Sequence, residues 1–360
     1  MKKKQLDYIP NDIVALEDYE KYAKEIMDEN SMSYICSGAG DEITMNKNSD
    51  DFQKIFLTGR PLEDLKDANT KIILFHKEYD SPIMLAPVAY QKLVDCEGEI
   101  NTIRAANAFN KCMIVSSFAS SSIEEISQNA TAPLWFQLYM QEDMNDNLEL
   151  IKNAENLGYE ALVITIDAPI SGIRNKEQRA NFSLPSDITA VNIKKMPTLQ
   201  QSSNDGILSL CNTLPTWDDI EFIKKNTKIP VILKGITSAN YAQKAMKINI
   251  DGIVVSNHGG RTLDTLPSSI EILPKISKEV DKKMKIFLDG GIRRGTDVLK
   301  AIAVGADAVM IGRPIMYGLA TAGALGVAHT LKILQEELEA SMLFTGCKNI
   351  NAIKEIEIIN

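Results

Sequence analysis

The chain has 360 residues, a hydrophobic fraction of 44% and a formal net charge of −9 at pH 7. This length fits one large domain or two small ones, and the acidic balance argues against a nucleic-acid partner, which requires a basic patch. The five cysteines (36, 96, 112, 211 and 347) have no metal-binding spacing, so we expect reduced thiols, no metal site and a cytoplasmic protein. No apolar run reaches the roughly 18 residues of a membrane span, so we expect neither a span nor a signal peptide.

Residues 1–80 precede the first buried strand. The segments DYEKYAKEIM (18–27) and MSYICSGAGDE (32–42) predict helices. The segment FHKEYDSP (75–82), which contains His76, predicts a hairpin before the main fold. We therefore expect a helical N-terminal extension.

Eight apolar runs of strand length follow. They are nearly continuous in Val, Ile and Leu, as strands buried on both faces should be. The runs are PIMLAPV (82–88), MIVSSF (113–118), LWFQLY (134–139), ALVITID (161–167), PVILKG (230–235), GIVVSN (252–257), IFLDGG (286–291) and AVMIGR (308–313). Helix-like segments lie between them, among them 98–110, 145–158, 238–249 and 295–305, and His329 falls in a C-terminal helix.

Strand–helix alternation repeated eight times predicts an α/β fold, a (β/α)8 TIM barrel. Residues 183–215, between the fourth and fifth strands, are polar and lack clear periodicity, and a loop this long is usually a functional lid or a disordered insert. We expect one domain over 1–360, with the extension over 1–80, the barrel over 81–345 and this long insert after strand 4. Two domains stay open as an alternative, although no Pro/Gly/Ser-rich linker divides the chain.

Polar side chains gather at the C-terminal ends of the predicted strands, where a barrel carries its active site. In strand order these ends carry Pro87, Val88 and Ala89; Ser116, Ser117 and Phe118; Gln137 and Tyr139; Thr165 and Asp167, with Arg174 beyond; Lys234; Ser256, His258 and Arg261; Asp289, Gly290, Gly291 and Arg293; and Gly312 and Arg313. Any one of them has a purely structural explanation, but a barrel built for stability alone does not need all of them at one end.

The last two strand ends predict a phosphate site. Glycines in IFLDGGIRRG and AVMIGRP allow backbone N–H groups to approach an anion, and Arg293 and Arg313 add positive charge. Barrels commonly bind phosphate in the loops after strands seven and eight. A phosphorylated ligand is therefore favoured over glycines that serve tight turns alone.

His258 is one of only three histidines and stands directly after a buried strand. Asp167 is suited to hold and charge-stabilise its imidazole, while Arg174 and Arg261 are suited to grip a carboxylate. Tyr139 and Tyr34 could hydrogen-bond to the same substrate. A base flanked by two arginines indicates proton removal from a small carboxylic acid.

The motifs SNHGGRTLD, DGGIRRGTDVLKA, IGRP, WFQLY and ITIDAPISGIR resemble those of the FMN-dependent α-hydroxy acid oxidases and dehydrogenases. That family includes glycolate oxidase, L-lactate oxidase and mandelate dehydrogenase. The resemblance runs from about Tyr34 to Cys347, which is nearly the whole chain. It implies an enzyme that binds FMN and oxidises a small 2-hydroxy acid to the 2-oxo acid.

The resemblance also implies roles for individual residues. His258 is expected to be the base in oxidation of the α-carbon, with Asp167 behind it, and Tyr139 to hydrogen-bond to the substrate hydroxyl. Arg261, Arg174 and Tyr34 are expected to bind the carboxylate, and Phe118 to line the substrate pocket. Lys234 is expected near N1 and O2 of the flavin. The other expected FMN contacts are Pro87, Val88, Ala89, Ser116, Gln137, Thr165, Ser256, Asp289, Gly291, Arg293, Gly312 and Arg313.

Three positions bear on the choice of substrate and electron acceptor. Phe118 stands where family members often carry Trp or Tyr, which leaves an apolar wall suited to lactate or a somewhat larger apolar acid. Thr262 replaces a frequent Gln. Ala89 resembles the alanine that oxidases carry beside the flavin, and with no haem domain or membrane segment in the sequence it favours O2 as acceptor, giving H2O2. A dehydrogenase that uses a quinone or another acceptor is the alternative, and a homotetramer or homo-octamer is expected.

Two other classes of protein remain open. A flavin-free (β/α)8 isomerase of a sugar phosphate would use the same phosphate loops but would not need Arg174, Arg261 and His258 together. A binding or regulatory barrel that has lost catalysis would not need to keep every inferred catalytic residue.

Overall fold

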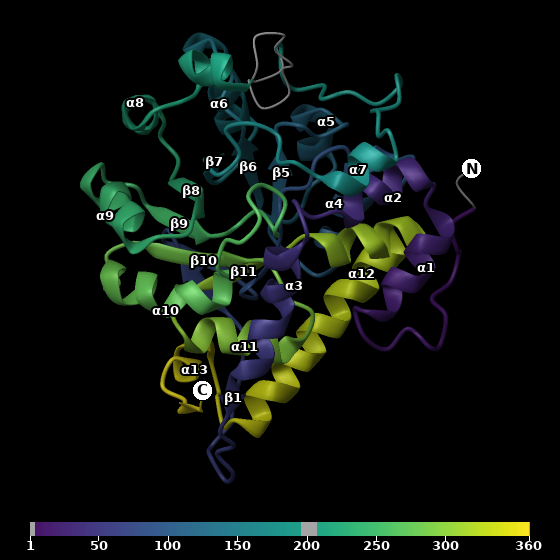
Figure 1. The fold of residues 1–360 in the computed structure, drawn as a ribbon. Helices are drawn as coiled ribbons and strands as arrows, with labels where there is room; N and C mark the ends of the chain where they lie inside the picture. Colours follow the sequence, from purple (N-terminus) through teal and green to yellow (C-terminus); the bar gives the residue numbers. More distant parts are fainter. Residues whose placement is uncertain (1–3, 196–206, 360) are drawn as a thin grey trace.

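The computed structural model describes residues 4–195 and 207–359, and its centre is a closed barrel of eight parallel strands (Figure 1). Neighbouring strands around the barrel follow the order β10-β11-β4-β5-β6-β7-β8-β9. The strands are β4 (Ile83–Leu85), β5 (Met113–Ser116), β6 (Leu134–Leu138), β7 (Leu162–Thr165), β8 (Val231–Ile236), β9 (Gly252–Val255), β10 (Lys285–Asp289) and β11 (Ala308–Ile311). Six of them fall within the predicted runs, while β8 ends one residue later and β10 begins one residue earlier than predicted, so the predicted barrel is confirmed.

Helices surround the barrel as the alternating pattern predicts (Figure 1). They are α4 (Glu99–Ala108), α5 (Ile123–Gln128), α6 (Met144–Asn156), α7 (Asn175–Arg179), α8 (Trp217–Asn226), α9 (Ala239–Lys247), α10 (Ser269–Val280), α11 (Gly295–Ala303) and α12 (Arg313–Phe344). Local capping starts several of them. Ser268 accepts a hydrogen bond from Glu271 N at α10, and Thr216 with Asp219 forms a capping box at α8. The strand ends are therefore held in a rigid frame.

The N-terminal extension packs against the barrel and shares its hydrophobic core. It contains α1 (Asp18–Ile26), α2 (Glu29–Cys36), α3 (Ile43–Asp50), the 3-10 turn η1 (Asp51–Lys54) and β1 (Phe56–Leu57). Helix α1 lies along α12, where the Tyr19 hydroxyl is 2.8 Å from His329 Nδ1 (Figure 1). At the other end of the chain α13 (Ile350–Ile353) precedes β12 (Ile358–Ile359), which pairs with β1.

The predicted helix over 32–42 is wrong beyond Cys36. Ser37 has extended backbone (φ −78°, ψ 148°) and Gly40 has φ +52°, so the chain leaves the helix at the SGAG sequence. The predicted hairpin around His76 is confirmed, because β2 (Ile72–Leu74) pairs with β3 (Lys77–Tyr79). The end of α2 at Cys36 matters for the site. The carbonyl groups of Tyr34, Ile35 and Ser37 there accept hydrogen bonds from Arg261 and Arg313.

The long segment expected over 183–215 is described in two parts, and residues 196–206 lie outside the described residues. Residues 183–195 pack on the barrel: Val191 N donates to Ala119 O at 3.3 Å, and Asn192 Oδ1 accepts from Ile123 N at 2.9 Å. Residues Ile207–Thr213 form the 3-10 helix η4, which leads into α8. The first part therefore lies close to the barrel mouth at β5.

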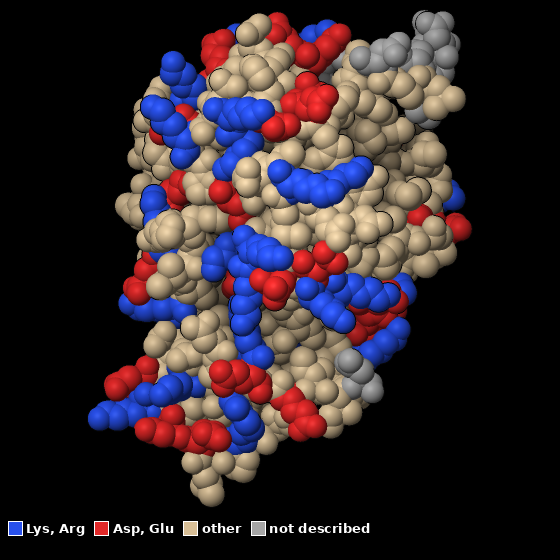
Figure 2. Space-filling view, turned by 90° about the vertical axis from the view of Figure 1, so that its left-hand side faces the viewer, with Lys and Arg blue, Asp and Glu red and all other residues tan. Residues whose placement is uncertain are grey.

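Acidic and basic side chains are intermixed on the face shown in Figure 2, with no extended single-sign region there. Within the described part of the chain, no helix combines the length and the apolar character needed to cross a membrane.

Candidate active site

His258, Asp167 and Tyr139 meet at the mouth of the barrel. His258 Nδ1 lies 2.8 Å from Asp167 Oδ1, and Nε2 lies 3.1 Å from the Tyr139 hydroxyl. An ionised carboxylate only accepts hydrogen bonds, so Asp167 fixes the ring proton on Nδ1 and leaves the Nε2 lone pair facing Tyr139. The structure thus assembles the three residues that the sequence analysis expected to act together.

The backbone conformation after His258 explains why glycines follow it. His258, Gly259 and Gly260 have φ angles of +59°, +63° and +73°, so three successive residues lie in the left-handed region. A side chain on Gly260 would place its Cβ 2.6 Å from the backbone of Met45. A non-glycine residue with positive φ stores strain and is enriched at functional sites. The His-Gly-Gly sequence therefore turns the chain sharply and aims the imidazole into the site.

The electrostatic surroundings keep His258 neutral and Asp167 ionised. Burial lowers the pKa of His258 below its ordinary value, and the neighbouring Asp167 offsets this only in part. The pKa of Asp167 would be raised by its own burial, but His258 and Lys234 outweigh that effect and lower it. A neutral imidazole oriented by an anionic carboxylate is a proton acceptor at neutral pH.

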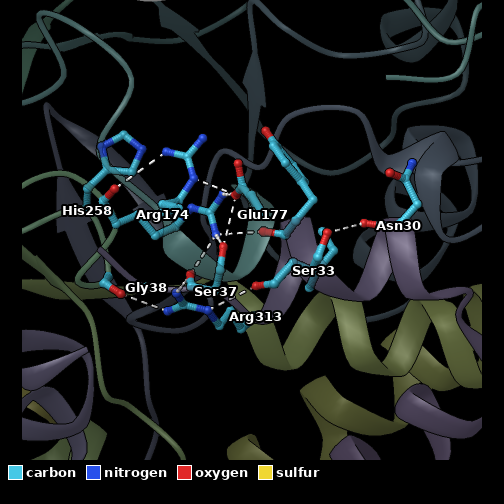
Figure 3. A network of polar contacts seen from close by, with 12 residues as sticks. Asn30, Ser33, Ser37, Gly38, Arg174, Glu177, His258 and Arg313 are labelled. Atoms are coloured by element: carbon cyan, nitrogen blue, oxygen red, sulfur yellow. Dashed lines mark hydrogen bonds and ion pairs between the residues drawn. The ribbon is translucent and has the colours of Figure 1, made fainter. Parts of the chain in front are cut away.

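Arg261 and Arg174 line the same cavity as His258. Arg174 lies beside Glu177 (Figure 3). Arg261 Nη1 donates to the carbonyls of Tyr34 and Ser37 at 2.7 and 2.9 Å, and its guanidinium lies 5.0 Å from the centre of the Tyr34 ring. Arg174 Nε donates to Glu177 Oε1 at 2.5 Å. Two partly buried guanidinium groups side by side form a site for a carboxylate.

A small cavity lies between these groups. Aromatic rings form one side of it: Phe118 is 2% exposed, and its ring centre lies 4.6 Å from that of Tyr139 and 5.9 Å from that of Tyr90. The cavity is lined by Tyr34, Ala89, Phe118, Tyr139, Ala168, Ile170, Ser171, Gly172, Arg174, His258, Arg261 and Thr262. Its charged end carries the arginines and its apolar end carries Phe118, which suits a small acid with an apolar side chain.

A larger cavity adjoins it, and the two share Tyr34, Ala89, Tyr139, His258 and Arg261 in their linings. Its lining includes most of the residues expected to hold the cofactor: Pro87, Val88, Ala89, Ser116, Lys234, Asp289, Gly291, Arg293, Gly312 and Arg313. Arg313 is the first residue of α12, whose N-terminal N–H groups favour an anion, and Arg293 lines the same cavity. The Arg313 guanidinium donates to the carbonyls of Gly259 and Ser37, both at 2.8 Å.

The residues present fit FMN. Lys234 Nζ lies 2.9 Å from Asp289 Oδ2 and 3.0 Å from Ser256 Oγ. Asp289 Oδ1 is buried and has no hydrogen-bond partner within the described residues, so it is available to a polar group in the cavity. Burial tends to lower the pKa of Lys234, but Asp289 and Asp167 outweigh this and raise it. A fixed positive charge of this kind suits the electron-accepting ring of a flavin.

Three expected cofactor residues lie outside the lining of the larger cavity. Gln137 links two strand ends, with Oε1 accepting from Ser116 Oγ at 2.8 Å and Nε2 donating to Thr165 Oγ1 at 3.0 Å. Ser256 Oγ accepts from Lys234 Nζ and from His258 N. Thr165 lines a separate apolar cavity between the ends of β7 and β8. These residues hold the cavity's lining side chains in place.

The sequence analysis missed residues that the fold brings to the site. Glu177 contacts both Arg174 and Arg261, and Ser37 contacts Arg261 and Glu177. Asn48 and Met45 of α3 line the larger cavity. Arg174 and Glu177 are three residues apart, and this spacing could have predicted an ion pair on one face of a helical turn. Asn48, Met45 and Ser37 come from the N-terminal extension and carried no motif.

Comparison with known protein families identifies the family to which a chain with this site belongs. Residues 23–360 match the family model described as FMN-dependent dehydrogenase. The chain belongs to this family. Its relatives include a 2-hydroxyacid oxidase of Dictyostelium discoideum, 41% identical with 94% of this chain and 88% of that protein covered, and an L-lactate oxidase of Nostoc sp., 38% identical with 94% and 96% covered.

Solved structures agree with the family assignment. A mandelate oxidase with (S)-2-phenylpropionate superimposes with a TM-score of 0.89 and 37% identity, covering 96% of this chain and 98% of that one. As a member of the FMN-dependent dehydrogenase family the chain is a flavoenzyme with FMN as its cofactor. The larger cavity, which is lined by Arg293, Arg313, Lys234 and His258, fits that cofactor.

Proposed function

We propose that this enzyme oxidises a small L-2-hydroxy acid, such as L-lactate, to the 2-oxo acid and passes the electrons to O2, giving H2O2. The observation that carries the proposal is the His258–Asp167 pair: His258 lines one cavity together with two arginines and also lines the cavity that fits FMN. The oxidase names of the relatives from Dictyostelium discoideum and Nostoc sp. support O2 as the acceptor.

In this proposal the chain binds, orients and deprotonates the substrate, while FMN supplies a two-electron acceptor. Arg174 and Arg261 hold the carboxylate by paired charged hydrogen bonds, with Tyr34 beside them. Tyr139 hydrogen-bonds to the substrate hydroxyl. His258 Nε2 takes a proton from the substrate as the α-carbon is oxidised, and Asp167 stabilises the imidazolium that results.

The cofactor contacts divide into two groups. The flavin ring is contacted by Pro87, Val88, Ala89, Ser116 and Lys234, and Lys234 supplies the positive charge. These side chains are held in place by Gln137, Thr165 and Ser256. The ribityl chain and the phosphate of FMN are contacted by Asp289, Gly291, Arg293, Gly312 and Arg313. The two arginines and the N-terminus of α12 favour an anion there.

The small cavity supports a substrate of lactate size or slightly larger. Phe118 offers no hydrogen-bond donor and packs between Tyr90 and Tyr139, so this wall is apolar and fixed. Ala89 lines both cavities, and its methyl group stands beside the expected flavin ring. A dehydrogenase that passes the electrons to a quinone is the competing assignment for the acceptor.

An absorbance spectrum of the purified protein tests the proposal. A yellow protein is expected to bleach when L-lactate is added without oxygen and to recover in air with formation of H2O2. Bleaching that persists in air and is reversed by a quinone would point to a dehydrogenase. His258→Gln is the matched variant: it is expected to keep bound FMN and lose reduction by substrate. A variant that loses the flavin instead would make His258 a structural residue.

We also propose a cytoplasmic homo-oligomer, a tetramer or an octamer. All five cysteines are free thiols, which suits a reducing compartment. Phe56, Leu62 and Phe344 are exposed, and Arg60 N donates to Phe344 O at 3.4 Å, so the segment around Leu62 and the end of α12 lie together. Apolar side chains grouped in this way suit contact with another subunit. Light scattering that gives the mass of one chain at micromolar concentration would contradict this assembly.

A further inference from the structure

The two arginines of the site are anchored very differently. Arg261 is fixed by backbone carbonyls of Tyr34 and Ser37, which belong to the end of α2 and the residue after it. Arg174 has no comparable backbone anchor among the described residues: its bond to the Arg261 carbonyl is long, at 3.5 Å, and its short contact is with Glu177 Oε1 at 2.5 Å. The position of Arg174 therefore depends on Glu177.

Glu177 is itself held in place by residues from outside its own helix. Its Oε1 atom accepts from Ser37 Oγ at 2.9 Å and from Arg261 Nη2 at 3.4 Å, in addition to Arg174 Nε (Figure 3). The side chains of Arg174 and Glu177 are 13% and 11% exposed, so solvent screens this pair weakly. One carboxylate oxygen thus joins both guanidinium groups and the N-terminal extension.

The charges of the cluster suit a monoanionic ligand. Two guanidinium groups and one carboxylate carry a net charge of +1, which one substrate carboxylate neutralises. Without Glu177 the two arginines would repel each other at close range, and a buried cation would remain when the substrate is bound. Glu177 contacts Arg174 through Nε, and the one bond of a terminal nitrogen within the described residues, from Nη1 to the Arg261 carbonyl, is long at 3.5 Å, so the terminal nitrogens can donate to the ligand.

Resting on the function proposed above, we propose that Glu177 is the positioning residue for substrate binding, because it fixes the guanidinium of Arg174 in the orientation that holds the carboxylate. It acts through Arg174 and does not touch the reacting atoms. Because Arg174 holds the carboxylate equally before and during the reaction, loss of Glu177 weakens binding more than it slows turnover. Ser37 completes the arrangement by fixing Glu177 from the N-terminal extension.

The test compares Glu177→Ala, Glu177→Gln, Arg174→Lys and the double variant Glu177→Ala/Arg174→Lys as FMN-loaded enzymes. Propanoate serves as the binding probe, since it has a carboxylate and no hydroxyl to oxidise, and its Kd is read from the flavin spectrum. Glu177→Ala is expected to raise this Kd and the KM for L-lactate about tenfold, with kcat within about twofold, as expected for loss of a charge-assisted hydrogen bond. Glu177→Gln is expected to have a smaller effect, because its amide oxygen can still accept from Arg174 Nε.

The double variant decides whether Glu177 acts through Arg174. Adding Glu177→Ala to Arg174→Lys is expected to change Kd little, since the residue to be positioned is already altered. A tenfold increase in that background too, or an unchanged Kd for Glu177→Ala in the native background, would overturn the proposal. Gln178→Ala is the matched control on α7, where that side chain accepts a bond from Asn175, and it is expected to leave Kd unchanged.

The failure of this inference is distinguishable from failure of the proposed function. If no 2-hydroxy acid bleaches the native flavin, the proposed reaction is wrong, yet the ratio of propanoate Kd values still tests Glu177. A fall in melting temperature or FMN content with unchanged Kd would make Glu177 a structural residue and overturn its positioning role.

Discussion

Asp167 and His258 are hydrogen-bonded at 2.8 Å, although they follow two barrel strands that are not neighbours. Asp167 follows β7 and His258 follows β9, while β8 lies between these strands in the barrel. The contact is made over Gly235 of β8, which has φ +113°. Because Gly235 has no side chain, Asp167 and His258 can approach each other across β8.

Gly235→Ala is therefore expected to displace Asp167. A Cβ at this position would lie 2.4 Å from Asp167 Cβ, too close for either strand end to remain in place. We expect kcat to fall by about 10²-fold, the loss typical of misplacing a catalytic group by roughly 1 Å. Gly158→Ala is the control, because Gly158 also has positive φ (+86°) and open space around it. Equal kcat in the two variants would mean that the steric contact with Asp167 has no catalytic consequence.

The pH dependence of kcat/KM follows from the lowered pKa of His258. Burial favours the neutral imidazole, so the base form is fully present above the ordinary value of 6.5 and is lost only as the pH falls through a lower value. We expect a plateau at neutral pH and an acid limb with its midpoint below 6.5. Asp167→Asn is expected to lower kcat and to move the midpoint further down, because Asp167 raises the pKa of His258. An acid limb centred above 6.5 would contradict this assignment.

Arg261→Lys is expected to weaken substrate binding strongly. The guanidinium spans the Tyr34 and Ser37 carbonyls while facing the small cavity, and a single ammonium cannot reproduce this fork. We expect KM for L-lactate to rise about a hundredfold, as is typical when one partner of a buried charged pair is lost. Arg179→Lys, an exposed position on α7, should leave KM unchanged. An unchanged KM and kcat in Arg261→Lys would remove Arg261 from the carboxylate role.

Phe118→Ala is expected to shift substrate preference toward larger 2-hydroxy acids. The ring is buried against Tyr90 and Tyr139, and its removal lengthens the apolar end of the small cavity. We expect the ratio of kcat/KM for 2-hydroxyhexanoate to that for L-lactate to rise about tenfold, while stability falls by about 3–5 kcal/mol from the new cavity. Steady-state kinetics with both acids and thermal unfolding measure the two effects. A constant ratio would place the substrate side chain elsewhere.

The sequence by itself determined the architecture and most of the site. Eight buried apolar runs set the number and order of strands, because strands covered on both faces need continuous apolar residues. In a closed parallel barrel all strand ends of one kind meet at one mouth, so His258, Asp167 and the arginines could be grouped without coordinates. The motif resemblance then supplied the FMN-dependent family, which the comparison confirmed.

Only the tertiary structure decided how these residues are held. The end of α2 at Cys36, the bond from Ser37 to Glu177 and the passage of the catalytic pair over Gly235 join segments distant in sequence. Local patterns do not encode such contacts, since they arise when separate elements pack and leave a carbonyl, a carboxylate or a missing side chain at the right point. The sequence therefore identified the reacting groups, and the packing around them decided which neighbours orient them.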